Sequence, residues 1–178
     1  MPLRSRFLLA LAAGLLAVPA ARAAPHHSSA TKTAAGSAAP KALGTFGAWT
    51  AATYEQNGQT VCYAFTRAHP VGTAGPNGPL LTVTERPASR DEVAITGTSE
   101  YPKDSEVMLQ VGQAGVEMYT AGRDAFARDP KAAVAALRRG SQAVARAPDT
   151  HGARSVDTYS LDGFTKAYDA IIKACPAR

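Results

Sequence analysis

The chain has 178 residues, of which 46% are hydrophobic, and its 19 Lys and Arg against 14 Asp and Glu give a formal net charge of +5 at pH 7. This length is typical of one domain with a single hydrophobic core. The basic residues are not interleaved with aromatic residues, which argues against nucleic-acid binding, and no apolar run approaches the roughly 20 residues of a membrane-spanning helix.

The first 23 residues have the order of a secretory signal peptide. Residues 1–6 are basic, residues 7–18 are almost wholly apolar, and Ala21 and Ala23 are small residues at the two positions that a signal peptidase reads. We therefore expect residues 1–23 to be removed and the mature protein, which then has no transmembrane segment, to be periplasmic or secreted.

Removal of this segment changes the charge of the protein. Three of the 19 basic residues leave with it, so 16 remain against 14 acidic residues and the formal charge falls to +2. Residues 45–122 carry four basic and eight acidic residues, whereas residues 123–154 carry seven and three. This asymmetry is typical of two regions of opposite charge that attract each other within one domain, or of a basic face that binds an anion. Candidate residues for such a face are Arg138, Arg139, Arg146 and Arg154.

Residues 24–44 are rich in Ala, Ser, Thr, Gly and Pro without apolar periodicity, so they are predicted to be a flexible tether to a domain at 45–178. The domain opens with a predicted hairpin, because Asn57-Gly58 is a strong signal for a two-residue turn. In that register the numbers of paired residues sum to 115. Cys62 then lies opposite Thr53, on the same face as Trp49.

Alternation and turn residues predict further short strands, and residues 69–79 between them are a loop rich in Pro and Gly. The adjacent carboxylates Asp91 and Glu92 are predicted to lie on a solvated surface. A short helix is expected at 130–139, with Pro130 at its first position and Gly140 at its end. The predicted strands cover residues 80–85, 93–98, 106–111, 116–120, 141–147 and 153–159.

An amphipathic helix is predicted after Ser160, which is a natural N-cap. Pro176 ends this helix. The fold class is therefore mainly β: an antiparallel sandwich or partly closed barrel of short strands, with one short internal helix and a C-terminal amphipathic helix. The apolar stripe of the last helix consists of Leu161, Phe164, Tyr168, Ile171, Ile172 and Cys175.

Cys62 and Cys175 are the two cysteines of the chain. In an oxidising compartment they have one possible pairing, and we expect a Cys62–Cys175 disulfide. The loop it closes exceeds 100 residues, for which the chain-entropy model gives roughly 4–5 kcal/mol of stabilisation. The alternative, free thiols acting as nucleophile or metal ligand, lacks Cys-x-x-Cys spacing and an adjacent histidine.

The sequence contains no strong catalytic motif. It has no Gly-x-Ser-x-Gly elbow, Walker loop, dinucleotide fingerprint or EF-hand loop, and no cofactor or metal site is expected. A small hydrolase using His151 or His69 is the enzymatic alternative, since His151 lies near Asp149 and Ser155. A polar turn at Pro-Asp-Thr-His-Gly is the simpler interpretation of these residues.

Several short blocks across residues 44–175 resemble the invasion associated locus B family. The resemblance implies a small, mainly β, exported protein of a Gram-negative bacterium, and it brings no catalytic residue with it. Longer members have additional cysteines, whereas this chain has one pair. The blocks are Phe46-Gly47-Ala48-Trp49, Val61-Cys62-Tyr63, Arg86-Pro87, Tyr101-Pro102, Leu137-Arg138-Arg139-Gly140-Ser141 and Asp157-Thr158-Tyr159-Ser160-Leu161-x-Gly163-Phe164, with a cysteine closing the last helix.

The sequence thus predicts a non-enzymatic, exported protein that binds a protein or another component of the envelope or cell surface. Its disulfide-linked scaffold would display loops such as residues 68–79 to the partner. The alternatives are the hydrolase and an anion- or glycan-binding module that uses the basic region 123–154. The sequence does not indicate the oligomeric state.

Overall fold

The computed structural model describes residues 39–68, 78–148 and 154–177. The predicted signal peptide, most of the predicted tether, and the histidines at 69 and 151 lie outside these ranges. Within them, no helix is both long and apolar enough to cross a membrane.

Ten antiparallel strands form one sheet in the order β1-β2-β3-β4-β5-β8-β7-β6-β9-β10. The strands are β1 (Lys41–Phe46), β2 (Trp49–Gln56), β3 (Gln59–Arg67), β4 (Leu80–Glu85), β5 (Glu92–Thr96), β6 (Glu106–Val111), β7 (Ala114–Ala121), β8 (Asp124–Ala127), β9 (Gln142–Pro148) and β10 (Arg154–Ser160). The helices are α1 (Pro130–Arg139) and α2 (Phe164–Ala174).

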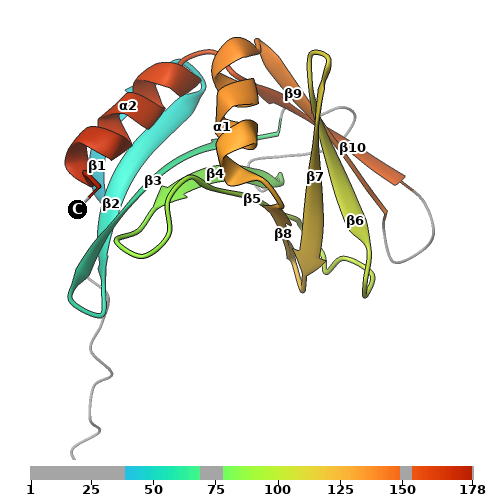
Figure 1. The fold of residues 1–178 in the computed structure, drawn as a ribbon, viewed down its shortest axis with the longest axis horizontal. Coiled ribbons are helices and arrows are strands. Elements are labelled where there is room, and N and C mark those ends of the chain that lie inside the picture. Colours follow the sequence, from blue (N-terminus) through green and yellow to red (C-terminus); the bar gives the residue numbers. More distant parts are fainter. Residues whose placement is uncertain (1–38, 69–77, 149–153, 178) are drawn as a thin grey trace, which may run out of the picture. The chain divides into compact units, whose positions relative to one another are not determined.

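The sheet is strongly curved, and both helices lie on the same side of it (Figure 1). α2 packs on β1, β2 and β3, and α1 packs on β5 and β7. The side of the sheet that faces the helices encloses the core, whose largest fully buried side chains include Trp49, Leu81, Leu109, Tyr159 and Phe164. The opposite side is called the outer face below. The mainly β prediction is confirmed: the sheet is open and sandwich-like.

The entry hairpin has the predicted register. Asn57 and Gly58 both have positive φ, at 52° and 75°, as a type I′ turn requires. Cys62 pairs with Thr53, and the partners of β2 and β3 sum to 115 throughout. The sheet begins earlier than predicted, however, because β1 starts at Lys41 and pairs with β2. Residues 41–44 therefore belong to the sheet and not to a tether.

Two other differences concern the second half of the chain. β8 was not predicted, because its four residues contain only one large apolar side chain, Phe126. α2 does not begin at Ser160, which is still paired with Gln142 in the sheet. Gly163, at φ 84°, is the residue before the first helical turn, and no side chain caps that turn. α1 agrees with its prediction, since Asp129 accepts a 3.0 Å hydrogen bond from the Ala132 N–H and Gly140 follows the helix.

Candidate functional site

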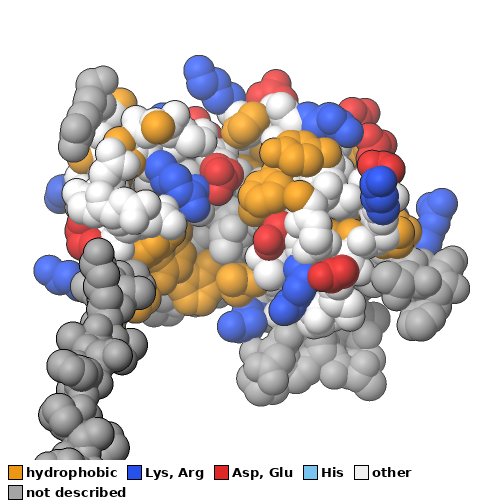
Figure 2. All heavy atoms as spheres, turned by 90° about the horizontal axis from the view of Figure 1, so that it is seen from below, with side chains coloured by type: hydrophobic (Ala, Val, Ile, Leu, Met, Phe, Trp, Pro, Cys, Tyr) orange, Lys and Arg blue, Asp and Glu red, His pale blue; other side chains and the backbone are white. Residues whose placement is uncertain are grey.

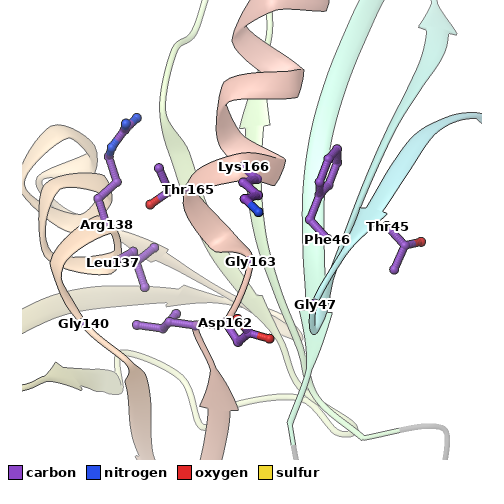
Figure 3. A pocket seen from close by; sticks show the side chains of 11 residues that line it. Thr45, Phe46, Gly47, Leu137, Arg138, Gly140, Asp162, Gly163, Thr165 and Lys166 are labelled. Atoms are coloured by element: carbon purple, nitrogen blue, oxygen red, sulfur yellow. The ribbon is translucent and has the colours of Figure 1, made fainter.

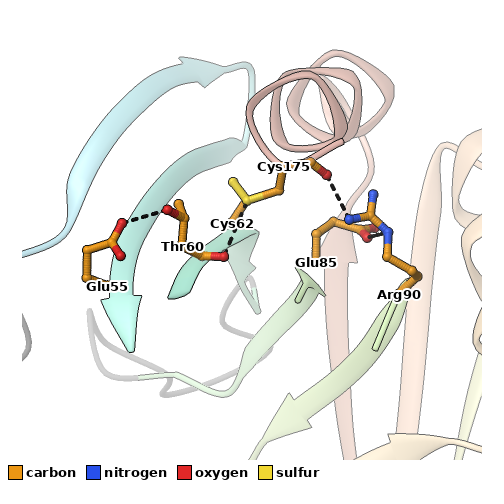
Figure 4. Close-up of a disulfide and its surroundings, with 6 residues drawn as sticks. All are labelled: Glu55, Thr60, Cys62, Glu85, Arg90 and Cys175. Carbon is orange, nitrogen blue, oxygen red and sulfur yellow. Dashed lines mark hydrogen bonds and ion pairs between the residues drawn. A yellow bond between two sulfur atoms is a disulfide. The ribbon is translucent and has the colours of Figure 1, made fainter. Parts of the chain in front are cut away.

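A disulfide joins Cys62 on β3 to Cys175 at the end of α2, with the two Cα atoms 6.0 Å apart (Figure 4). The expected pairing is confirmed. The other end of α2 is held by aromatic packing, since the rings of Trp49 and Phe164 meet edge to face with centroids 4.8 Å apart. α2 is thus fixed to the entry hairpin at both ends, by a covalent bond and by aromatic packing.

A buried carboxylate lies beside the disulfide. The side chain of Glu85 has no exposed surface, and its Oε2 lies 2.7 Å from Nε of Arg90. Arg90 Nη1 also donates a 2.7 Å hydrogen bond to the Cys175 carbonyl oxygen, so one guanidinium connects β4 to the end of α2 (Figure 4). Burial raises the pKa of Glu85 to about 7, with Arg90 opposing the shift and Asp91 adding to it.

Asp91 is part of the same cluster, so it is half-buried and hydrogen-bonded within the protein and not simply solvated as predicted. Its backbone N–H donates to Glu85 Oε1 at 3.3 Å, and its Oδ1 accepts a 2.5 Å hydrogen bond from the Tyr168 hydroxyl. Burial and the neighbouring Asp91 raise the pKa of Tyr168. These groups connect the β4–β5 loop to α2, and their contacts with one another give them a structural role.

A polar pocket of about 460 Å³ lies where the β1–β2 turn meets the loop between β10 and α2 (Figure 3). Here the backbones of Gly47 and Gly163 approach closely, and a Cβ on Gly163 would overlap the Phe46 carbonyl oxygen. Arg138 and Lys166 extend along the pocket (Figure 3). Arg138 is engaged internally: its Nη1 lies 3.1 Å from Asp169 Oδ1 and its guanidinium lies over the Tyr168 ring.

The structure separates the four candidate anion-binding arginines. Arg138 and Arg139 lie in the last turn of α1, where positive charge is favourable for the helix dipole. Arg146 on β9 and Arg154 on β10 instead line a pocket of about 410 Å³ on the outer face. Only the second pair contributes to a common surface of the sheet.

That outer surface carries the exposed large apolar side chains of the described residues: Met108, Tyr119 and Val156 are 38%, 44% and 49% exposed. We call these three residues, together with Phe126, the apolar patch. Tyr119 pairs with Phe126 across β7 and β8, and their ring centroids are 5.6 Å apart. Hydrophobic side chains gather on the side of the sheet away from the helices, with charged groups around them (Figure 2).

Charged side chains of both signs alternate with the apolar patch across the strands. Arg146 pairs with Met108 on one side and with Val156 on the other. Glu117 is the other neighbour of Met108. Arg128 lies over the Tyr119 ring, 5.8 Å from its centroid. The patch is therefore a mixed surface that can contact a partner through aromatic, aliphatic and charged groups.

Sequence reasoning did not identify the apolar patch. Met108, Tyr119 and Val156 belong to strands that were predicted, and alternation places each of them opposite the buried side chains of its strand. The sequence does not show that these three positions lie in the same part of one face, because strand order is a property of the whole sheet. The described residues contain no group of three His, Cys, Asp or Glu side chains that could hold a metal ion.

Comparisons with known proteins agree on one family. The sequence model of the Invasion associated locus B (IalB) protein family matches residues 49–172. The crystal structure of invasion associated protein b from Bartonella henselae is similar to this fold, with a TM-score of 0.55 and 21% sequence identity over 74% of this chain and 96% of that chain. No curated protein matches the sequence. Because the family model covers more than half of the residues, this chain belongs to the invasion associated locus B family.

Proposed function

We propose that this protein is an exported, non-enzymatic binding protein of the cell envelope, and that it contacts a protein partner through the apolar patch. The observation that carries the proposal is that Met108, Tyr119 and Val156 are all exposed on one face of the sheet, within the run of strands β7-β6-β9-β10. Aromatic residues, Met and Arg are enriched in protein–protein interfaces. Single exposed apolar residues are ordinary on protein surfaces, whereas several on one face indicate an interaction site.

Three features support a rigid scaffold that works outside the cytoplasm. The first 23 residues have the pattern of a signal peptide. Disulfides persist in oxidising compartments, and Cys62 and Cys175 are joined. The chain also belongs to a family with a member named for invasion, the Bartonella protein. The loop at residues 69–77 lies outside the described residues, so the proposed contact surface is the sheet itself.

A photo-crosslinking experiment tests the binding surface. A photoreactive amino acid is placed at Tyr119 and, as a control, at Ala132, an exposed position on α1. We expect an adduct with one envelope protein from Tyr119 only. The purified partner should then bind the wild-type protein, and Met108→Lys should weaken that binding by about tenfold or more, because it places a charge in the patch. Equal adducts from both positions would contradict the proposal, as would unchanged affinity of Met108→Lys.

Export is tested separately by cell fractionation and N-terminal sequencing. We expect the mature protein in the periplasm or medium, with its first residue close to Ala24. A cytoplasmic protein that retains Met1 would refute export while leaving the apolar patch as a binding surface.

A further inference from the structure

A shallow, open groove of about 670 Å³ runs along α2 on the helix side of the molecule, away from the apolar patch. Residues from α2, from the start of α1 and from the β4–β5 loop line it. We call it the helix groove and define it by Lys131, Tyr168, Ile172, Lys173 and Pro176. Its volume is more than half as large again as that of the pocket on the outer face, and both have a mainly apolar lining.

The floor of the helix groove is apolar and held in place. Ile172 and the Tyr168 ring are half-buried, and Pro176 follows them at the end of the helix. The Tyr168 ring is fixed from three directions: its hydroxyl donates to Asp91, Arg138 lies 5.3 Å from its centroid on one face, and Phe164 packs beside it at 5.9 Å. A ligand that contacts this ring therefore does not have to order it first.

The rim of the groove carries more available positive than negative charge. Asp169 is paired with Arg138, whereas Asp91 accepts a hydrogen bond from the neutral Tyr168 hydroxyl and keeps its single negative charge. Glu85, behind the groove, is paired with Arg90. By contrast, neither Lys131 nor Lys173 forms an ion pair with any acidic side chain in the part of the chain that the structure describes. Both lysines are exposed.

We propose that the helix groove binds a small anionic amphiphile. The hydrocarbon part lies against Tyr168, Ile172 and Pro176, and the negatively charged group pairs with Lys131 and Lys173. An apolar floor alone would select any hydrocarbon, but the two lysines add a preference for a carboxylate or phosphate head group. The inference does not rest on the proposed function, since the groove and the apolar patch share no residue.

The test is a titration of the folded protein with decanoate, decyl phosphate and 1-decanol. Binding is monitored through the amide chemical shifts of α2 in NMR spectra. We expect both anions to shift amides of residues 168–175 and to bind about fivefold or more tightly than decanol. Comparison of the two anions shows whether the site prefers a carboxylate, as in a fatty acid, or a phosphate, as in a lipid head group. Binding should weaken as salt increases.

Matched variants test whether Lys131 and Lys173 supply the positive charge that binds the head group. Lys131→Gln with Lys173→Gln should weaken decanoate binding about fivefold or more, whereas Lys103→Gln with Lys166→Gln, which makes the same charge change outside the groove, should leave it unchanged. Ile172→Asn should weaken all three ligands, with the melting temperature as a check on folding. Equal binding of decanol and the anions would overturn the proposal. So would unchanged binding of the Lys131 and Lys173 variant, or shifts confined to the outer face.

Discussion

The indole Nε1 of Trp49 donates a 2.9 Å hydrogen bond to the carbonyl oxygen of Ser160, although 111 residues separate them in sequence. Next to it, the Ala48 N–H donates to the Asp162 carbonyl oxygen at 3.1 Å. These bonds join the β1–β2 turn and the start of β2 to the end of the edge strand β10, where α2 begins. The Gly-x-Trp and Ser-Leu-x-Gly blocks, by which the sequence resembles its family, are thus the two halves of one junction.

Gly163→Ala tests this junction. Gly163 has φ 84° and lies against the Phe46 carbonyl. An alanine there would have a strained backbone, and its Cβ would overlap the Phe46 carbonyl oxygen. We expect a loss of more than about 2 kcal/mol in the free energy of unfolding, measured by urea denaturation. Gly122→Ala is the matched control, because Gly122 has φ 62° but no heavy atom near the position of a Cβ. Its loss should be about 1 kcal/mol. Equal losses would show that the close approach has no energetic role.

Cys62→Ala should lower the free energy of unfolding by up to about 4–5 kcal/mol, because the disulfide closes a loop spanning 113 residues. The melting temperature should fall by about 10–15 °C in calorimetry. Cys175→Ala and the double variant should give nearly the same value, since all three remove one bond. A wild-type protein whose melting temperature is unaffected by reductant would contradict this prediction.

Glu85 should make stability depend on pH. Its pKa is raised to about 7 in the folded protein from 4.5, so between these values the folded state binds more protons than the unfolded state. The contribution of Glu85 to stability is then present below pH 4.5 and is lost as the pH rises through about 7. Urea denaturation from pH 4.5 to 8 should show this decline, and Glu85→Gln should flatten it.

The flattening in Glu85→Gln is the decisive readout, because glutamine does not titrate, whereas the absolute stability also changes with the altered contact to Arg90. Glu92→Gln is the control, since Glu92 pairs with Arg86 at a partly exposed site. If both variants keep the wild-type pH slope, the slope does not come from Glu85.

Tyr159→Phe should leave stability unchanged or raise it by up to about 1 kcal/mol. The Tyr159 side chain is fully buried, and its hydroxyl has no hydrogen-bond partner among the described residues. Burial raises the pKa of this phenol, which is therefore neutral at all ordinary pH values. Removing an unsatisfied buried hydroxyl relieves a desolvation cost without loss of packing. Tyr168→Phe is the contrasting variant: it loses the bond to Asp91 and should cost about 1–2 kcal/mol.

The features that the sequence predicted are those that local chemistry determines. Asn57-Gly58 sets a two-residue turn, and that turn alone sets the register that places Cys62 opposite Thr53. Asp129 and Pro130 define the start of α1 for the same reason, since N-cap and first-turn preferences depend on neighbouring residues. With one cysteine pair, the disulfide had one possible connectivity.

The features that the sequence did not predict depend on distant partners. Ser160 is a good N-cap residue, but pairing with Gln142 in β9 keeps it in the sheet, and the helix begins only after Gly163. The burial of Glu85 follows from α2 and the β4–β5 loop closing over it, which no local pattern near Glu85 shows. The apolar patch likewise depends on the strand order, which places β8 between β5 and β7.

The separation of Cys62 and Cys175 has a consequence for biosynthesis. The first thiol lies 113 residues before its partner, so it has to remain unreacted, or exchange partners, until the rest of the chain is present. During that interval α2 is not yet packed on the entry hairpin, so the apolar surface around Trp49 is exposed to solvent. A nascent chain at this stage exposes both a reactive sulfur and an adhesive apolar surface, which are features that chaperones and oxidoreductases recognise.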